Sequence, residues 1–315
     1  MNHLYLIFFL VLLSSNCTHV DHSNPPPVDI SSGTLERHED FPSEYVASRN
    51  VDVWLPDGYS ADDQYAVLYM HDGQMLYDST KSWNKQEWGV DETMGQLIES
   101  GKIEETIVVG VWNTELRHSE YFPQKPFERL GEDVQDSLLN LAFGSPDNRL
   151  FKDEIQSDNY LKFLVRELKP FIDKNYATYP NAEKTFIAGS SMGGLISMYA
   201  ICEYPEVFSG AACLSTHWLG TFDTLNNPIP AAFASYLNDR LPDPETHRIY
   251  FDFGTETLDA FYEPFQNAID SIMVSKGYND QNWASLKFEG EDHSERAWYK
   301  RLHIPITFLM SDEEQ

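Results

Sequence analysis

A serine flanked by glycines is the strongest chemical signal in this chain. A short apolar run, 186–188, leads into the pattern Gly189-x-Ser191-x-Gly193, and a helix-forming run follows at once. A strand, a tight turn and a helix in this order place a serine at the apex of the turn, with its hydroxyl exposed above a sheet. The glycines remove the bulk that would keep the strand and the helix apart. The pattern predicts Ser191 as a nucleophile and the Met192 amide as a donor to the oxyanion formed in its attack.

A serine nucleophile needs a base, and the base needs a carboxylate that orients it. His293 lies in a polar loop after the strand-like run 283–289. A loop that leaves the last strand is where the base belongs when the chain order is serine, acid, histidine. We therefore predict His293 as the base. His217 follows another strand-like run and is expected to line the cleft, whereas His247 and His303 are expected to be structural.

Two carboxylates compete for the role of orienting acid. Glu256 and Asp259 both lie on the loop that follows the strand-like run 248–254. Asp259 is the preferred candidate because it begins the next helix, from which its carboxylate can turn back toward His293. Glu256 stays the alternative, and the carboxylate without a catalytic role is expected to stabilise the positive end of that helix.

The second oxyanion donor is expected on a loop after an early strand. The run 65–71 reads as such a strand, and Gly73 behind it would let the backbone come close to the cleft. This position makes the amide of Gln74 the natural partner of the Met192 amide. The removal of one such donor typically costs about 3–4 kcal/mol of transition-state stabilisation.

With these residues in view, the chain resembles the putative-esterase family of α/β-hydrolases, which includes esterase D, feruloyl and acetylxylan esterases (carbohydrate esterase family one), siderophore esterases and mycolyltransferases. The resemblance covers residues 45–311 and is carried by four segments in the family's order, 67–74, 187–194, 254–259 and 290–294. It implies a serine esterase with the nucleophile, base, acid and oxyanion amides at Ser191, His293, Asp259, Gln74 and Met192.

Strand-like and helix-like segments alternate along the chain, which predicts an α/β fold. We expect the α/β-hydrolase fold, a mostly parallel, doubly wound sheet flanked by helices, with the site at the carboxyl ends of its strands. Apolar residues at helical spacing predict a helix over 159–169, and Pro170 is expected to kink or interrupt it. The irregular stretch 113–158 is expected to form a lid-like insertion beside the cleft.

Aromatic and basic side chains near the predicted cleft are candidates for substrate contacts. They are Trp83, Trp88, Arg117, Tyr121 and His217. Aromatic platforms suit sugar rings and aryl acids, which favours an ester linked to carbohydrate. The alternative for each aromatic residue is that it simply packs within the fold.

Charge and cysteine usage exclude several classes of function. Lys and Arg number 22 against 50 Asp and Glu, so the formal net charge is -28. Such a surface repels polyphosphates and anionic lipid, which argues against nucleic-acid binding and against charge-driven membrane docking. No Cys or His spacing suggests a metal site, and no glycine-rich phosphate loop suggests a nucleotide, so we expect neither metal nor cofactor. Cys202 and Cys213 are expected to be buried thiols.

The N-terminal residues read as a targeting segment. Residues 4–13 form an apolar run of signal-peptide length, and Cys17 follows in a sequence that resembles a lipoprotein cleavage box. We expect residues 1–17 to be a signal peptide, 18–44 a flexible tether and 45–315 the esterase domain. The expected location is outside the cytoplasm, either as an outer-membrane or cell-surface lipoprotein anchored at Cys17 or as a periplasmic or secreted protein.

The expected function is hydrolysis of acetyl or feruloyl esters of polysaccharide through an acyl-enzyme. Cleavage of a siderophore trilactone is the first alternative, although a catecholate–iron complex calls for a basic site and this chain has few cations. A non-catalytic glycan-binding lipoprotein is the second alternative. Its expected mark is a missing triad residue, and the sequence supplies all three.

Overall fold

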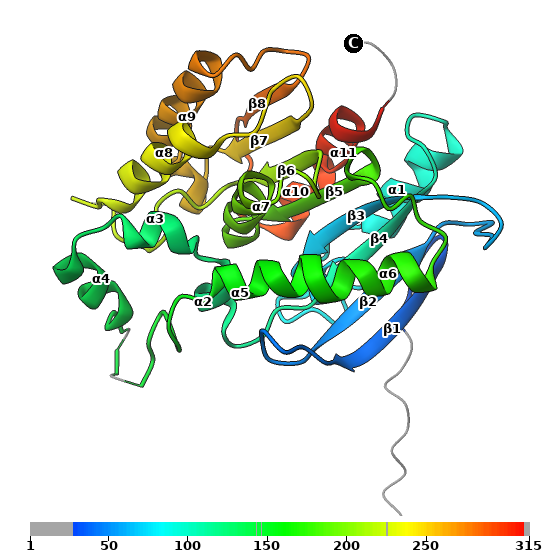
Figure 1. The fold of residues 1–315 in the computed structure, drawn as a ribbon, viewed down its shortest axis with the longest axis horizontal. Helices are drawn as coiled ribbons and strands as arrows, with labels where there is room; N and C mark the ends of the chain where they lie inside the picture. Colours follow the sequence, from blue (N-terminus) through cyan, green and yellow to red (C-terminus); the bar gives the residue numbers. More distant parts are fainter. Residues whose placement is uncertain (1–27, 143, 146, 225, 312–315) are drawn as a thin grey trace, which may run out of the picture.

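Eight strands form one sheet in a computed structural model that describes residues 28–142, 144–145, 147–224 and 226–311 (Figure 1). The strand order is β1-β2-β4-β3-β5-β6-β7-β8. The strands are β1 (Thr34–Phe41), β2 (Arg49–Leu55), β3 (Ala66–His71), β4 (Thr106–Val111), β5 (Thr185–Ser190), β6 (Gly210–Leu214), β7 (Arg248–Gly254) and β8 (Trp283–Phe288).

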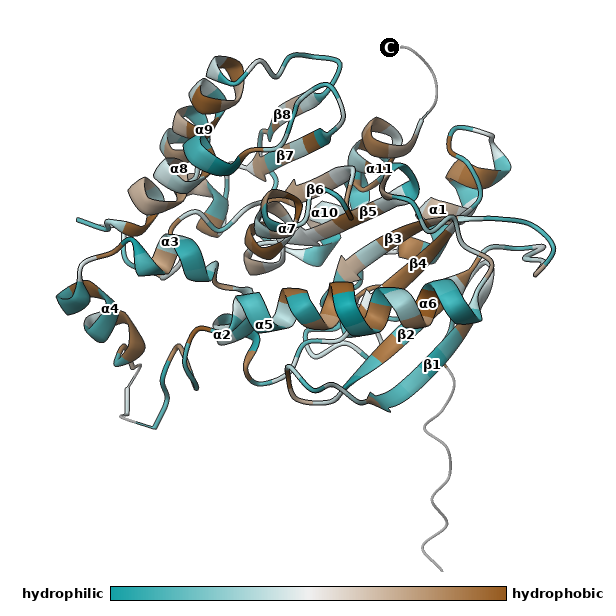
Figure 2. Ribbon diagram, in the orientation of Figure 1, coloured by the Kyte–Doolittle hydropathy of each residue, from teal (hydrophilic) through white to brown (hydrophobic). Residues whose placement is uncertain are grey.

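Strand direction follows the pattern of burial. The six strands from β4 to β8 in the sheet order are parallel, and each residue of β3, β4, β5 and β6 is buried. Continuous apolar runs of this kind are typical of parallel strands covered on both faces. β1 and β2 pair antiparallel at one edge, and the exposed and half-buried residues of β1 make it largely hydrophilic in Figure 2.

Helices cover both faces of the sheet and enclose two separate cores. One core includes side chains of α5 to α9, and the other includes side chains of α1, α10 and α11. The helices are α1 (Val90–Glu99), α2 (Arg117–Tyr121), α3 (Gln124–Glu128), α4 (Glu132–Leu139), α5 (Ser157–Lys162), α6 (Lys169–Asn175), α7 (Met192–Glu203), α8 (Ile229–Arg240), α9 (Glu263–Ser275), α10 (Glu295–Arg301) and α11 (His303–Met310). This arrangement confirms the predicted α/β fold.

The strand order reverses direction between β3 and β5. The chain runs from β3 to β4 on one side, whereas β5 lies on the other side of β3. At such a point the loops that leave the two neighbouring strands diverge and open a crevice at the carboxyl ends of the strands. The topology therefore predicts a crevice between the loop after β3 and the turn after β5, the two segments that carry the predicted oxyanion donors and nucleophile.

The predicted helix over 159–169 is confirmed, but Pro170 does not end it. A π-helical segment, Phe163–Leu168, joins α5 to α6, and the Lys169 N–H bonds to the Leu164 carbonyl five residues earlier. A wider turn lets the backbone pass the proline ring, which would clash with the carbonyl four residues before it in a regular helix.

The tether predicted for residues 18–44 is wrong from β1 onward. Thr34–Phe41 pairs with β2, and the segment before it is also anchored, because the Ser31 N–H donates to Asp91 (2.6 Å) and the Ser32 carbonyl accepts from the Trp54 indole (2.8 Å). An edge strand made mostly of polar residues lacks the apolar pattern of a buried strand, so this segment was predicted as a linker. Residues 1–27, with Cys17, lie outside the described part of the chain.

The stretch 113–158 forms three short helices, α2, α3 and α4, that pack on the main domain. Its large aromatic residues Tyr121, Phe122, Phe127 and Phe151 are buried in the core shared with α5 to α9. The packing alternative therefore holds for Tyr121, and all four side chains contribute to the core. None of the helices in the described part of the chain combines the length and apolarity needed to cross a bilayer.

Candidate active site

The turn between β5 and α7 holds Ser191 in a strained backbone conformation. Its φ is 57° and its ψ is -120°, a region that residues with side chains rarely adopt. The segment after β6 holds the turn in place: the Ser191 N–H donates to the Leu214 carbonyl (2.9 Å), and the His217 N–H donates to the Ser191 carbonyl (3.2 Å). Ser191 thus stands at the amino terminus of α7, where the helix dipole favours a developing anion.

Gly189 is required by a close backbone contact beside Ser191. A Cβ on Gly189 would lie 2.7 Å from the carbonyl carbon of Gly193, so strand and helix could not approach with any larger residue there. Gly193 in turn packs against the loop after β3, where a Cβ would lie 3.4 Å from the Asp72 carboxylate. The close approach predicted from the sequence pattern is therefore present.

Two backbone amides near Ser191 have no partner. Within the described residues, neither the N–H of Gln74 nor the N–H of Met192 donates a hydrogen bond. Gln74 lies in the 3₁₀ turn Gly73–Met75 after β3, and Met192 begins α7 after the neighbouring strand β5. Unused donors on two adjacent loops are what an oxyanion site requires.

We expect Gly73→Ala to lower kcat by about 10²-fold. A Cβ at this position would lie 2.6 Å from the Gly110 carbonyl carbon and 2.8 Å from Trp112 Cδ1, so the loop would move off β4 and take the Gln74 amide with it. Steady-state kinetics on para-nitrophenyl acetate measures the effect. Gly131→Ala is the matched control, because a Cβ there meets nothing within 4 Å. An equal loss in both variants would contradict the prediction.

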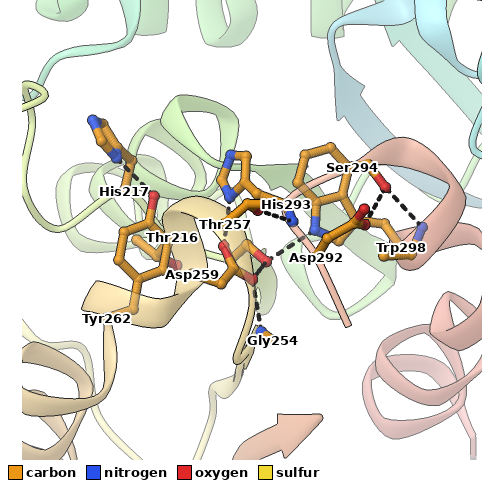
Figure 3. A network of polar contacts seen from close by, with 12 residues as sticks. Thr216, His217, Gly254, Thr257, Asp259, Tyr262, Asp292, His293, Ser294 and Trp298 are labelled. Atoms are coloured by element: carbon orange, nitrogen blue, oxygen red, sulfur yellow. Dashed lines mark hydrogen bonds and ion pairs between the residues drawn. The ribbon is translucent and has the colours of Figure 1, made fainter. Parts of the chain in front are cut away.

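His293 and Asp259 form a direct hydrogen bond, shown in Figure 3. The distance from His293 Nδ1 to Asp259 Oδ1 is 2.5 Å, and the Asp259 side chain is fully buried. The backbone also fixes the loop of the histidine, because the His293 N–H donates to the Thr257 hydroxyl (2.9 Å). Glu256 is exposed, so the structure places Asp259, the preferred candidate of the two, against the histidine.

The second oxygen of Asp259 is held by two donors. Oδ2 accepts from the Ser215 hydroxyl (2.6 Å) and from the Gly254 N–H (2.6 Å). Ser215 itself accepts from the Trp298 indole (2.9 Å) and from the Arg301 guanidinium (3.1 Å), and Arg301 is paired with the buried Asp252. This network fixes the orientation of the carboxylate, which leaves Oδ1 to accept from His293.

We expect Ser215→Ala to lower the free energy of unfolding by about 1–3 kcal/mol, because the Trp298 indole and one donor of Arg301 lose a buried acceptor. The kcat should also fall, but less than in a variant of Asp259 itself. Ser209→Ala is the matched control at the other end of β6, since the buried Ser209 hydroxyl has no hydrogen-bond partner among the residues that the structure describes. Urea unfolding of both variants checks the prediction, which fails if they are equally stable.

Arg117 is tied to the oxyanion loop by a bidentate ion pair. Its Nε and Nη2 lie 2.7 Å from the two oxygens of Asp72, and the Asn113 amide donates to the same carboxylate (2.5 Å). Although burial alone would raise it, the pKa of Asp72 is held below its ordinary value by Arg117 and these hydrogen bonds. The substrate contact predicted for Arg117 is therefore replaced in this structure by a contact that anchors the loop carrying Gln74.

Comparison with known proteins agrees with this geometry. The sequence model of the family described as "Putative esterase" matches residues 44–137 and 140–303, most of the chain. The chain belongs to this esterase family. It is therefore a carboxylic ester hydrolase of the α/β-hydrolase fold.

Individual relatives of this esterase are distant. It is 24% identical over 226 residues to the uncharacterized protein YbbA of Bacillus subtilis, which covers 71% of this chain and 72% of that protein. It is 25% identical over 200 residues to an endo-1,4-beta-xylanase/feruloyl esterase of Xylanibacter ruminicola, covering 59% of this chain and 22% of that protein.

Solved structures share the fold of this esterase at low sequence identity. A ferulic acid esterase superposes with a TM-score of 0.60 and 17% identity, covering 89% of this chain and 99% of that chain. An IroE-like serine hydrolase from Shewanella oneidensis superposes with a TM-score of 0.63 and 19% identity, covering 88% of this chain and 79% of that chain.

The structure places the other predicted substrate residues of this esterase in different environments. Trp83 is 81% exposed, as an aromatic platform requires. Trp88 and Tyr121 are 3% and 0% exposed, so neither ring is open to a substrate; Trp88 packs on Trp298 with ring centres 5.4 Å apart. His217 is also buried, and its Nδ1 lies 2.7 Å from the Tyr262 hydroxyl. Burial lowers the pKa of His217 well below its ordinary value, which keeps this ring uncharged beside the site.

Sequence reasoning missed Ser215 and Asp72. Ser215 supports the acid directly after β6, and Asp72 anchors the oxyanion loop directly after β3. Both follow the carboxyl end of a parallel strand, which is where ligand-facing polar residues gather in such sheets. That positional rule could have identified them without any motif.

Proposed function

We propose that this esterase is a serine hydrolase that works through an acyl-enzyme. Ser191 Oγ attacks the ester carbonyl carbon while His293 Nε2 takes the hydroxyl proton, and the amides of Gln74 and Met192 bind the resulting oxyanion. Collapse of the intermediate expels the alcohol, which receives the proton from His293 and leaves the acyl group on the serine. Water then attacks the acyl group by the same steps, with Asp259 orienting the imidazole throughout.

The hydrogen bond between His293 and Asp259 carries this proposal. A buried carboxylate that accepts from Nδ1 leaves Nε2 of the neutral ring unprotonated, and only that tautomer can take a proton from serine. Among the described residues no hydrogen bond joins Ser191 to His293. In substrate-free enzymes this contact often tightens only when the substrate is bound.

One short segment also links the proposed nucleophile to the acid–base pair. Leu214 and His217, the two ends of the segment 214–217, bond to the backbone of Ser191, and Ser215 between them donates to Asp259. The nucleophile and the acid–base pair are therefore positioned by the same piece of backbone, which supports their action as one unit.

We propose carbohydrate-linked acetyl or feruloyl esters as the substrates. Solved structures with this fold include a ferulic acid esterase and an enterobactin esterase, so a siderophore trilactone is the second candidate. The cations of α10, beside the base, favour the carbohydrate-linked esters over the trilactone. Arg296, Lys300 and Arg301 are paired with Asp292, Glu291 and Asp252, respectively. These paired cations offer little attraction to an anionic iron complex.

A panel of esters tests both proposals. It contains para-nitrophenyl acetate, methyl ferulate, acetylated xylan and a catecholate trilactone. In a separate experiment, labelling with a fluorophosphonate probe followed by peptide mass analysis locates the nucleophile. We expect the probe on Ser191 and the highest turnover on a sugar-linked ester. Preferred cleavage of the trilactone would favour the siderophore alternative, and a folded protein without turnover on any ester would favour glycan binding.

We also propose that the protein is exported and lipidated at Cys17, on the basis of the apolar run 4–13 and the sequence around the cysteine. Metabolic labelling with a clickable palmitate should mark the wild type and not Cys17→Ser. Labelling of both proteins, or of neither, would contradict the anchor, and fractionation then decides between secretion and retention.

A further inference from the structure

A cavity of about 410 Å³ lies beside the oxyanion loop. Its wall includes Gly73 and Gln74 of that loop together with three aromatic side chains, Tyr77, Trp83 and Trp112. Because Gln74 belongs both to the cavity wall and to the proposed oxyanion site, a molecule in the cavity would lie next to the reacting ester. No step of the proposed mechanism uses this space.

Trp83 stands on a segment that bridges the oxyanion loop and the loop of the base. The Asn84 amide donates to Glu295 (2.7 Å), and the Arg296 N–H donates to Gln86 (3.2 Å), so the segment is bonded to the start of α10. An indole that is 81% exposed gains almost nothing from burial in the fold. Its position on an anchored segment at a cavity wall favours a role in contacting a ligand.

Trp112 forms a fixed part of the wall. Its indole N–H donates to Asp52 (2.8 Å), and the Arg37 guanidinium lies 4.6 Å from the ring centre while pairing with the same carboxylate (2.7 Å). Since this N–H is already satisfied, Trp112 offers apolar surface to the cavity rather than a hydrogen bond.

Tyr77 is part of the same wall, and its hydroxyl lies beneath the accessible surface. The side chain is 4% exposed, and within the described residues its buried oxygen has no hydrogen-bond partner. Burial raises the pKa of Tyr77, so the group stays a neutral hydroxyl that can both donate and accept. A buried hydroxyl without a partner is unfavourable, and a ligand hydroxyl would satisfy it once the Tyr77 side chain turns toward the cavity.

The charged side chains of the wall are balanced. Two cations, Arg37 and Lys81, stand with two anions, Asp52 and Asp78, so their formal charges cancel. A neutral ligand fits this balance better than an anion such as a catecholate–iron complex, and a purely apolar chain would leave the Tyr77 hydroxyl unsatisfied.

We propose that this cavity is a sugar subsite that binds the carbohydrate part of the ester next to Ser191. Sugar rings present C–H faces that pack on indole rings and hydroxyl groups that can pair with Tyr77. The inference rests on the proposed esterase function and adds to it the place where the alcohol side of the substrate is held.

The test compares sugar-linked esters with methyl esters of the same acid. The sugar probes are acetylated oligosaccharides of xylose, mannose and glucose and a feruloylated arabinose. We expect wild-type kcat/KM to favour at least one of them, and Trp83→Ala to lower the ratio of sugar-ester to methyl-ester kcat/KM by about tenfold. Trp83→Phe, which keeps an aromatic face, should restore much of the ratio.

Tyr77→Phe should lower the same ratio by about fivefold, because it removes the hydroxyl without changing the volume of the ring. Tyr69→Phe is the matched control. Tyr69 also carries a buried hydroxyl that has no partner in the described part of the chain, but it packs in the other core, across the sheet. The control should leave the ratio unchanged.

The outcomes separate this inference from the function on which it rests. If Ser191→Ala abolishes turnover but no sugar ester is preferred, or if the Trp83 and Tyr77 variants lower both ester classes alike, the subsite is overturned and the esterase assignment stands. If Ser191→Ala retains turnover, the catalytic assignment itself fails.

Discussion

Ser191→Ala is expected to lower kcat by about 10⁴-fold or more on every ester the wild type cleaves. The Ser191 hydroxyl stands in the turn between β5 and α7, at the amino terminus of that helix, on a residue with a strained backbone conformation. Without Oγ no acyl-enzyme forms, although the oxyanion amides and the binding surfaces persist. Single-turnover and steady-state assays on para-nitrophenyl acetate measure the loss.

The fold should tolerate this change, because the contacts of the turn are made by backbone atoms. The hydrogen bonds of Ser191 to Leu214 and His217 involve its N–H and carbonyl and remain in the alanine variant. Circular dichroism and urea unfolding should therefore match the wild type within about 1 kcal/mol. Turnover within tenfold of the wild type, by protein free of contaminating esterase, would mean that another residue is the nucleophile.

Asp259→Asn is expected to lower kcat by about 10⁴-fold, the second large effect. An asparagine must keep its oxygen toward Ser215 and the Gly254 N–H, since both donate to Oδ2. Its amide nitrogen then faces His293 Nδ1 and donates to it, which forces the proton of the neutral ring onto Nε2. In that tautomer the imidazole cannot accept the serine proton.

Glu256→Gln is the matched control for the acid, because it makes the same chemical change on an exposed carboxylate of the same loop. Its kcat should stay within about threefold of the wild type. A large loss in Glu256→Gln together with a small loss in Asp259→Asn would reverse the assignment. Activity measured across pH in both variants would show which carboxylate supports the base.

Local sequence patterns were sufficient to locate the central strands and the turn that carries Ser191. The strands β3, β4, β5 and β6 are apolar at nearly every position, and the Gly-x-Ser-x-Gly turn marks its own position between a strand and a helix. Signals of this kind survive in a sequence because they depend on residues only a few positions apart. The choice between Glu256 and Asp259 was different, since both lie on one loop and either carboxylate had a local rationale.

Contacts between distant segments were either not predicted from the sequence or predicted wrongly. Trp88 looked like a substrate wall but packs on Trp298, which lies 210 residues later, and Arg117 looked like a substrate contact but pairs with Asp72. Burial and pairing of this kind depend on how strands and helices pack, which neither composition nor periodicity reports. The edge strand β1 was missed for a related reason. It is a strand because it pairs with β2, and its own mostly polar residues give no strand pattern.

The sequence by itself determined the candidate residues for the proposed chemistry: a serine in a turn of glycines, a histidine after the last strand and a carboxylate between them. The tertiary structure alone decided which carboxylate meets the histidine, which polar residues support it and where an aromatic cavity lies beside the oxyanion loop. The physical reason is that bond-forming groups are identified by residue type and local order. Their distances and burial arise only when the parallel strands bring their carboxyl ends to one edge of the sheet.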